Sequence, residues 1–420
     1  MAQARRVGHG AAATAARVAV VLATVALVTT ACAPTQDVRA VRRVAPSTTS
    51  TTTTTATTPS STLPSAVPTT VPTPVVPVAG WSPPSTTLPP AGGFTSVSCI
   101  SDVFCLGTGG GANEADASMS TGPGVVAAWD GATWAAPAVY FPAPASGAAT
   151  APEVPGIACT GGPLCVVVDG SGHTSSGDGT TWSPPAGLPV GPGAAADPTD
   201  PGPGHAGSRS AAVACPSSRF CAYVDNTGNV ATRTGTTWST PEAMTARSGS
   251  ATVELYQQGR VGVACADAST CTALVGGTVL DWNGSTWSAS PGPWPAGTTG
   301  DSAISCPTPA TCLAVRGSTV SFRTAGSGWS RPSVIDAGGR LDALSCPTAG
   351  FCVAADAAGN VVHLAGGTWS APTKVVPTPV DYAGDGTSVS CPDDQFCLVL
   401  DGDGDYATYQ GTAPAPGSTT

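Results

Sequence analysis

Seven times along the chain, a cysteine is followed by a second cysteine with five residues between the two. The first cysteines of successive pairs lie 60, 56, 50, 41, 40 and 45 residues apart. A tandem repeat of about 40 residues therefore organises the chain, with insertions in its early copies. The pairs are Cys99/Cys105, Cys159/Cys165, Cys215/Cys221, Cys265/Cys271, Cys306/Cys312, Cys346/Cys352 and Cys391/Cys397.

Each copy carries the signals of four short strands. The clearest copy, from Val213 to Pro241, alternates short apolar runs with Gly, Asn and Asp turns and contains no helical pattern. The first strand ends at the first cysteine, the second begins at the second cysteine, the third follows a turn and the fourth carries a Trp-Ser pair. Four-stranded units at this period are typical of a β-propeller. Seven copies predict an all-β, seven-bladed propeller.

The tryptophans of the fourth strands predict how the ring closes. They are Trp81, Trp134, Trp182, Trp238, Trp287, Trp329 and Trp369. Trp81 precedes the first cysteine pair, and no Trp-Ser follows the last pair. We expect residues 80–83 to add the fourth strand to the last blade, because closure removes an exposed sheet edge. The alternative is a decayed eighth copy at the N-terminus.

The first 31 residues are typical of an export signal. Arginines precede an apolar run, Val18–Val28, that is too short to span a bilayer comfortably. Residues 29–32 resemble a bacterial lipoprotein cleavage site, and Cys32 is the one cysteine outside the pairs. Lipidation of Cys32 would anchor the protein to the outer face of the cytoplasmic membrane without spanning it. The alternative is ordinary cleavage near Ala31 or Ala33, followed by secretion.

Composition divides the remaining chain. Residues 32–79 are rich in Thr, Pro and Ser, which predicts a disordered stalk, and the composition permits O-glycosylation without showing it. The propeller is expected over residues 80–412, followed by a disordered tail, 413–420.

In an oxidising compartment, the cysteine pairs predict seven local disulfides, each pinning the hairpin between the first two strands of a blade. A loop this small contributes roughly 2 kcal/mol by chain entropy. Zinc binding fits poorly, because zinc pairs usually lie two to four residues apart and the four histidines are dispersed.

The turns before the tryptophans indicate a family. Residues 176–182, Ser-Gly-Asp-Gly-Thr-Thr-Trp, and residues 130–134, Asp-Gly-Ala-Thr-Trp, resemble the Asp-box of sialidase-like propellers. This resemblance, to exported bacterial BNR/Asp-box repeat proteins, covers residues 80–412. It implies structural roles for the motif, with Asp supporting the turn and Trp packing between blades, and it specifies a fold better than an activity.

The strand order separates the two faces of the ring. Connections from the second to the third strand, and from one blade to the next, emerge on one face, and every long insertion is of this type. A ligand site is therefore expected on this long-loop face, for a glycan, a cell-wall polymer or an extracellular protein. The alternative is that these loops are filler. The candidate binding residues are Glu114, Asp116, Tyr140, Phe141, Glu254, Tyr256 and Arg260.

Cofactor binding has one candidate. Asp401, Asp403 and Asp405 resemble the start of a calcium loop, with carboxylates at alternate positions. However, Asp401 aligns with aspartates that open the same turn in other copies, and no Glu follows at the calcium-loop distance. No other cofactor is expected.

Charge and residue placement limit the function. Six of the 16 basic and one of the 26 acidic residues precede residue 80, so the propeller carries 10 positive and 25 negative groups. Such a surface is poorly suited to nucleic acid. A sialidase-like hydrolase needs three arginines on the substrate carboxylate, yet none occurs between Arg43 and Arg209. We expect a monomeric, non-enzymatic binding propeller. The alternatives are a sialidase-like glycoside hydrolase and a structural or assembly factor of an envelope complex.

Overall fold

The computed structural model describes residues 80–86, 94–110, 124–141, 156–162, 164–169, 172–189, 210–248, 251–255, 259–295, 298, 300–379 and 386–411. These residues all belong to one compact unit, Thr70–Thr420. The expected signal peptide, the stalk with Cys32 and the tail lie outside them. Within the described part, no helix has the length and hydropathy that a membrane crossing requires.

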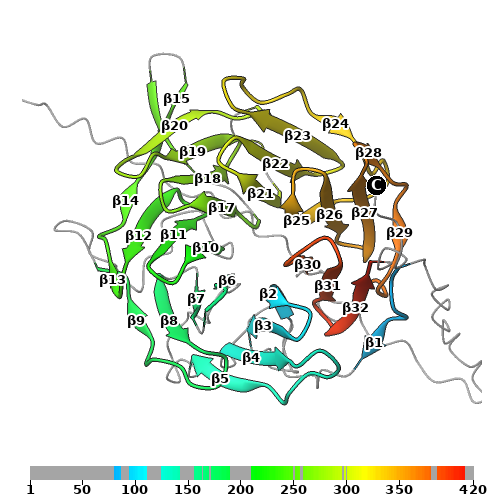
Figure 1. Cartoon of the computed structure of the whole chain (residues 1–420). Coiled ribbons are helices and arrows are strands. Elements are labelled where there is room, and N and C mark those ends of the chain that lie inside the picture. Colours follow the sequence, from blue (N-terminus) through cyan, green and yellow to red (C-terminus); the bar gives the residue numbers. More distant parts are fainter. Residues whose placement is uncertain are drawn as a thin grey trace, which may run out of the picture. The chain divides into compact units, whose positions relative to one another are not determined.

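Seven antiparallel sheets form the blades of a ring, as predicted (Figure 1). Blades 1 to 7 follow chain order, and the first strand of each lies at the centre. These inner strands are β2 (Phe94–Ser101), β6 (Gly156–Cys159), β10 (Ala211–Ser217), β17 (Gly262–Asp267), β21 (Ser302–Thr308), β25 (Leu341–Thr348) and β30 (Thr387–Ser390).

The second strand of each blade is mainly apolar because it is covered on both faces, whereas several third strands carry polar residues. The second strands are β3 (Phe104–Gly110), β7 (Cys165–Val168), β11 (Phe220–Asp225), β18 (Thr270–Val275), β22 (Thr311–Arg316), β26 (Phe351–Asp356) and β31 (Phe396–Asp401). The third strands are β4 (Gly124–Trp129), β8 (His173–Gly177), β12 (Asn229–Thr234), β19 (Thr278–Trp282), β23 (Thr319–Thr324), β27 (Asn360–Ala365) and β32 (Asp405–Gln410). Every described residue of β11 and of β31 is buried.

The outer strands are short. They are β5 (Ala138–Phe141), β9 (Ala186–Gly187), β13 (Thr237–Trp238) with β14 (Glu242–Ala243), β20 (Trp287–Pro291), β24 (Ser333–Val334), β28 (Thr368–Trp369) with β29 (Thr373–Lys374), and β1 (Ser85–Thr86). In six blades the tryptophan pairs with the third strand separately from the rest of the outer strand. Each of these six has a proline two or three residues after the tryptophan, which removes a ladder donor. Blade 4 has Ala289 and Ser290 there, and its β20 pairs with β19 without interruption.

The serine after the tryptophan explains the Trp-Ser pattern. In blade 2, the Ser183 N–H donates to the Ser176 carbonyl at 2.8 Å, and the Ser183 hydroxyl accepts from the Ser176 N–H at 3.0 Å. Ser82, Ser239, Ser330 and Ser370 make the same pair of bonds in their blades. One serine thereby satisfies two backbone groups where proline stops the strand.

The two ends of the ring meet in blade 7, as the sequence predicted. Ser85 pairs with Tyr406 and Thr86 pairs with Asp405, so β1 lies beside β32 (Figure 1). Trp81 is buried, and its ring centroid lies 5.5 Å from that of Tyr409.

The core is divided among the seams, which we define as the boundaries between neighbouring blades. Seven apolar clusters occur among the described residues, one at each seam. The seam between blades 7 and 1, for example, packs Leu398 and Leu400 against Phe94 and Val97. Burying such a side chain contributes roughly 1.5–3 kcal/mol. The ring is therefore closed by apolar packing all the way round.

All seven predicted disulfides are present. Each joins the inner strand to the second strand of its own blade, with Cα–Cα distances of 4.0–4.1 Å. A spacing this short is typical of a non-hydrogen-bonded antiparallel pair. The N–H and C=O of the first cysteine therefore point away from the second strand, toward the central channel.

The second cysteine of each pair lies in the interior of the ring. Although the sequence indicated these cysteines as disulfide partners, it did not predict how deeply they are buried. Their second strands are covered by the neighbouring blades, so their exposed fractions are only 0–2%. These side chains therefore serve the core and are not accessible as binding groups. The seven residues are Cys105, Cys165, Cys221, Cys271, Cys312, Cys352 and Cys397.

The turns that resemble the Asp-box have the expected geometry. The Asp178 carboxylate accepts from the Thr180 N–H at 2.9 Å and the Thr181 N–H at 2.8 Å, which lowers the pKa of Asp178. Asp130 makes the equivalent bonds, and Asn283 replaces the aspartate in blade 4. The glycine that follows has a φ of 91–97° in all three turns, a region that favours glycine.

One element was not foreseen. The insertion between blades 3 and 4 contains a two-stranded hairpin, β15 (Thr245–Ser248) and β16 (Ala251–Glu254). It projects from the rim of the ring (Figure 1).

Candidate functional site at the channel mouth

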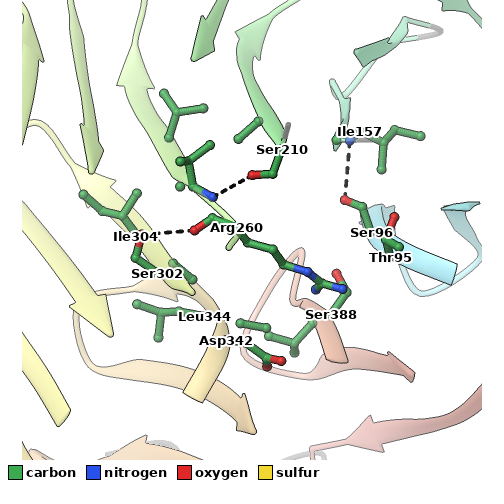
Figure 2. Close-up of a pocket in the computed structure, with 18 of the residues that line it drawn as sticks. Thr95, Ser96, Ile157, Ser210, Arg260, Ser302, Ile304, Asp342, Leu344 and Ser388 are labelled. Carbon is green, nitrogen blue, oxygen red and sulfur yellow. Dashed lines mark hydrogen bonds between the residues drawn. The ribbon is translucent and has the colours of Figure 1, made fainter. Parts of the chain in front are cut away.

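A cavity of about 220 Å³ lies at the centre of the ring, lined by residues of all seven inner strands. The lining comes from the starting ends of these strands, such as Thr95–Val97 of β2 and Ser302–Ile304 of β21 (Figure 2). The connections between blades lead into these ends, so the cavity belongs to the long-loop face.

Arg260 crosses this cavity. It lies just before β17 in blade 4, where its N–H donates to the Asp301 carboxylate at 2.8 Å and its carbonyl accepts from the Ser302 N–H at 3.0 Å. Its guanidinium donates to the Thr387 carbonyl of blade 7 at 2.9 Å. Figure 2 shows the side chain extending across the channel toward Asp342 and Ser388. The guanidinium brings a positively charged group into the mouth.

Asp342 supplies the carboxylate of the site. It lies in β25 of blade 6 and is buried, and its carboxylate accepts from the Thr387 hydroxyl at 2.9 Å and the Thr387 N–H at 3.2 Å. Burial raises the pKa of Asp342 to about 7, although Arg260 and the Thr387 hydroxyl favour the charged form. The charge balance of the mouth therefore changes near neutral pH.

Serine hydroxyls join neighbouring inner strands around part of the channel. Where a serine precedes the first cysteine, its hydroxyl accepts from the N–H of the first cysteine in the next blade at 2.9–3.0 Å. These bonds are Ser305 to Cys346, Ser345 to Cys391, Ser390 to Cys99 and Ser98 to Cys159. We call this level the lower tier. In the upper tier, two residues earlier in each strand, Ser388 accepts from the Val97 N–H at 3.0 Å and Ser96 from the Ile157 N–H at 3.4 Å.

The candidate residues from the sequence have different places. Arg260 lies in the cavity, whereas Tyr140 is buried between blades 1 and 2 with its ring 5.9 Å from that of Trp182. Burial raises the pKa of Tyr140 well above its usual range. Phe141 ends β5 and Glu254 ends β16. Glu114, Asp116 and Tyr256 lie outside the described residues.

The aspartates considered for calcium form a turn. In blade 7 the Asp401 carboxylate accepts from the Asp405 N–H at 2.8 Å. The same bond joins Asp225 to Asn229 and Asp356 to Asn360 in blades 3 and 6. Burial raises the pKa of Asp401 to about 7, as do the nearby charges of Asp405 and Asp403. Among the described residues, no group of three His, Cys, Asp or Glu side chains is arranged to hold a metal ion.

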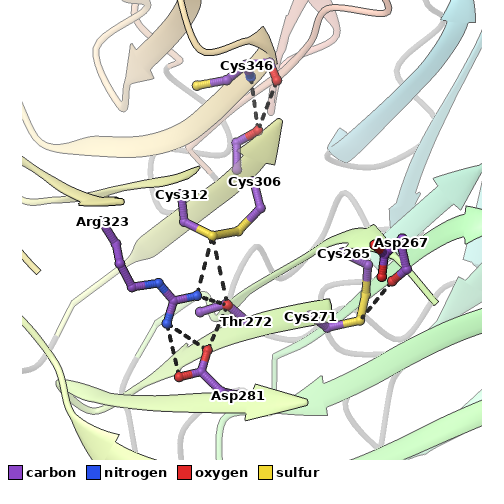
Figure 3. The surroundings of a disulfide bond; sticks show 10 residues. Cys265, Asp267, Cys271, Thr272, Asp281, Cys306, Cys312, Arg323 and Cys346 are labelled. Carbon is purple, nitrogen blue, oxygen red and sulfur yellow. Dashed lines mark hydrogen bonds and ion pairs between the residues drawn. A yellow bond between two sulfur atoms is a disulfide. The ribbon is translucent and has the colours of Figure 1, made fainter. Parts of the chain in front are cut away.

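A second charged cluster lies away from the mouth (Figure 3). Arg323 of blade 5 donates to the Asp281 carboxylate of blade 4 at 2.7 and 3.0 Å and lies 3.5 Å from the Cys312 sulfur. It also stacks over Trp329, with its guanidinium carbon 5.2 Å from the ring centroid. This arrangement clamps two blades together and leaves Arg323 engaged in structure.

The described part of the mouth contains few groups suited to chemistry. Arg260 is the one arginine lining the cavity, and no histidine lines it. His173 pairs with Asp169 at 2.9 Å in a turn equivalent to those of Asn229 and Asn360, so the turn accounts for this contact.

No protein-family model matches the sequence, and no curated protein matches it. Among solved structures, the chain is similar to YCF48 bound to D1 peptide, at 14% identity and a TM-score of 0.50, over 81% of this chain and 99% of that one. It is also similar to an inactive histidine variant of virginiamycin B lyase from Staphylococcus aureus with quinupristin, at 8% identity and a TM-score of 0.55, over 79% and 99%. The RRP9 WD40 repeats align at 9% identity and a TM-score of 0.52, over 78% and 97%.

The chain is a seven-bladed β-propeller. At these identities the likeness extends to the fold alone.

Proposed function

We propose that this propeller is an exported, non-catalytic protein of the BNR/Asp-box type that binds a segment of a partner protein at its channel mouth. The observation that carries the proposal is the cavity of about 220 Å³ to which all seven blades contribute, with Arg260 and Asp342 at its rim. One similar structure is of a propeller bound to a peptide, which supports this class of partner. Both a binding role and a role in assembling an envelope complex use such a site.

The test is site-specific photo-crosslinking from each face. Ala337 and Ala310 are both exposed turn alanines of the same region, but Ala337 lies in the connection from blade 5 to blade 6 on the long-loop face. Ala310 lies in a hairpin turn on the opposite face. With a photoreactive residue at each position in the full chain, we expect a protein adduct in envelope extracts from position 337 and none from 310. Equal adducts, or none, would contradict the proposal.

A glycan or cell-wall polymer is the other partner class raised by the sequence. A glycan array probed with the purified full chain, scored both for binding and for released sugar, distinguishes it. Binding without release would replace the protein partner by a glycan, and release would replace the binding role by a hydrolase.

Export and anchoring through Cys32 form part of the proposal. The arginine-flanked apolar run and the single unpaired cysteine support it. We expect metabolic labelling with a fatty-acid probe to mark the wild-type protein and to be lost in Cys32→Ala. Labelling that persists in the variant would contradict the anchor.

A further inference from the structure

The seams differ in how their channel-facing N–H groups are covered. At the seams between blades 2 and 3, 3 and 4, and 4 and 5, the lower-tier serine is replaced by Ala158, Ala214 and Ala264. The upper-tier positions of the same seams are Gly156, Ala212 and Gly262. None of these residues carries a hydroxyl, and we call these three seams, which lack it in both tiers, the bare seams. At the seams between blades 5 and 6 and between blades 6 and 7, Ala303 and Ala343 leave the upper tier without a hydroxyl, but Ser305 and Ser345 supply one in the lower tier.

The geometry shows that these positions face the same N–H groups as the serines do. A Cβ placed on Gly156 would lie 3.4 Å from the Val213 nitrogen, and one on Gly262 would lie 3.0 Å from the Ile304 nitrogen. The strand register relative to the disulfide is the same in every blade, so the Val263 N–H points to the channel as the Val97 N–H does. Ser210 lies two residues before Ala212, nearer the rim of the cavity, and its hydroxyl accepts from the Val261 N–H at 3.1 Å instead.

All six upper-tier residues of the bare seams line the cavity: Gly156, Ala212, Val213, Gly262, Val263 and Ile304. Among the described residues, no side-chain acceptor covers the N–H groups of Val213, Val263 and Ile304. Residues of a non-hydrogen-bonded pair direct both N–H and C=O to the same side. The bare seams therefore present donors and acceptors in alternation, as the free edge of a sheet does.

We infer that the bare seams bind the main chain of an extended segment of the partner protein. This inference rests on the proposed function and names the chemistry of its ligand. A peptide main chain carries the matching alternation of donors and acceptors, and addition to a free strand edge is an established mode of peptide recognition. The cavity has a volume of about 220 Å³. It admits a loop tip or chain end with small side chains.

Electrostatics favour an uncharged segment. Arg260 and Asp342 lie in the same cavity, and burial holds Asp342 near its point of half-ionisation at neutral pH. A segment with a strong charge of either sign meets one of these two groups unfavourably, whereas peptide carbonyl and N–H groups pair with both.

The test uses a phage-displayed library of random linear heptapeptides selected on the full chain. We expect enriched sequences to be uncharged and small, and N-methylation of one central amide in a selected peptide to weaken binding at least tenfold, because it removes a main-chain donor. Ala212→Ser places a hydroxyl opposite the Val263 N–H, as Ser96 does opposite Ile157, and is expected to weaken binding by a similar factor.

Ala310→Ser is the control. It makes the same change in an exposed turn on the opposite face, away from the cavity, and we expect binding to change less than twofold. Thermal unfolding establishes that both variants are folded. No enrichment, indifference to N-methylation, or equal effects of the two substitutions would overturn the inference. A photo-adduct at position 337 would still support the proposed function in each of these cases, so the two failures are distinguishable.

Discussion

The two sides of the channel solve the same packing problem differently. From blade 5 round to blade 2, a serine of each inner strand bonds the next strand at 2.9–3.0 Å, whereas between blades 2 and 5 alanine stands in its place. Disulfides and apolar clusters are present on both sides. The comparison shows that the ring does not need the hydroxyl bonds to close, so the inner strand edge is free to be covered in one region and offered to a ligand in another.

Opening the ring is expected to lower the free energy of unfolding more than any other change, because it exposes both seams of blade 7. Trp81→Ala removes a buried ring from the cluster between blades 6 and 7. We expect the free energy of unfolding to fall by about 3–5 kcal/mol, measured by urea denaturation. Val103→Ala, at a side chain 58% exposed, is the control and is expected to change it by less than about 0.5 kcal/mol. A small effect of Trp81→Ala would mean that closure does not depend on the N-terminal strand.

At the rim between blades 6 and 7, the Asp342 carboxylate accepts from the Thr387 N–H, a role that the Ser210 hydroxyl has for the Val261 N–H between blades 3 and 4. A carboxylate in this place makes the stability of the seam sensitive to pH. Its pKa is raised from 3.8 to about 7. The folded state therefore keeps a proton that the unfolded state loses, so this group's stability contribution is present below about pH 4 and is lost as pH rises to about 7.

The size of this loss is on the order of 4 kcal/mol. Asp342→Asn retains an acceptor for Thr387 and should remove this part of the pH dependence, with a higher unfolding temperature than wild type at about pH 8. The remaining slope between about pH 4 and 7 is expected from Asp401, whose pKa is raised in the same direction. An unchanged pH profile in the variant would show that Asp342 is not protonated in the fold.

Removing one seam serine tests the covered side. Ser345→Ala leaves the Cys391 N–H, now bonded at 3.0 Å, without its acceptor. We expect a loss of about 1 kcal/mol in the free energy of unfolding. Ser333→Ala, at an exposed serine of an outer strand, is the matched control and should be neutral. If the two substitutions had equal effects on stability, the Ser345 hydrogen bond would contribute nothing specific, and the covered and bare seams would not differ in energy.

Adding a serine tests the bare side and has the smallest expected effect. Ala214 is only half-buried, so Ala214→Ser has room to bring a hydroxyl to the Cys265 N–H. We expect a gain of roughly 0.5 kcal/mol, measured as a small rise in unfolding temperature in the absence of any partner. A loss of stability would mean that the bare seams are too tight for a hydroxyl.

The sequence predicted the features that repeat. The cysteine pairs fixed the period, and the position of Trp81 predicted closure correctly. The split outer strand was not predicted, although the proline after most of the tryptophans was visible and a ladder donor is lost there. The hairpin between blades 3 and 4 was also missed, because an insertion that occurs once has no repeat to reveal it.

The site was harder to predict, because its residues meet across the ring. Arg260 reaches Thr387 in blade 7, a contact between residues 127 positions apart that no local pattern indicates. Tyr140 was expected on the surface among the long loops, but its ring is buried against the next blade. The sequence shows alanine in place of serine before three of the cysteines. It does not show that the serine hydroxyl accepts from the next inner strand, because that contact joins two blades.

The closing strand sets an order of events during synthesis. Ser85 emerges from the ribosome long before Tyr406, its partner, so the ring can be closed only after Tyr406 has been translated. Each disulfide links residues six apart and can form locally, as soon as both of its cysteines have been synthesised. The hairpins of individual blades can therefore be cross-linked early, while the sheet of blade 7 still lacks its outer strand. A sheet with an uncovered edge is prone to aggregation. A chain truncated shortly before residue 405 would keep its disulfide-linked hairpins but could not pair the N-terminal strand with blade 7.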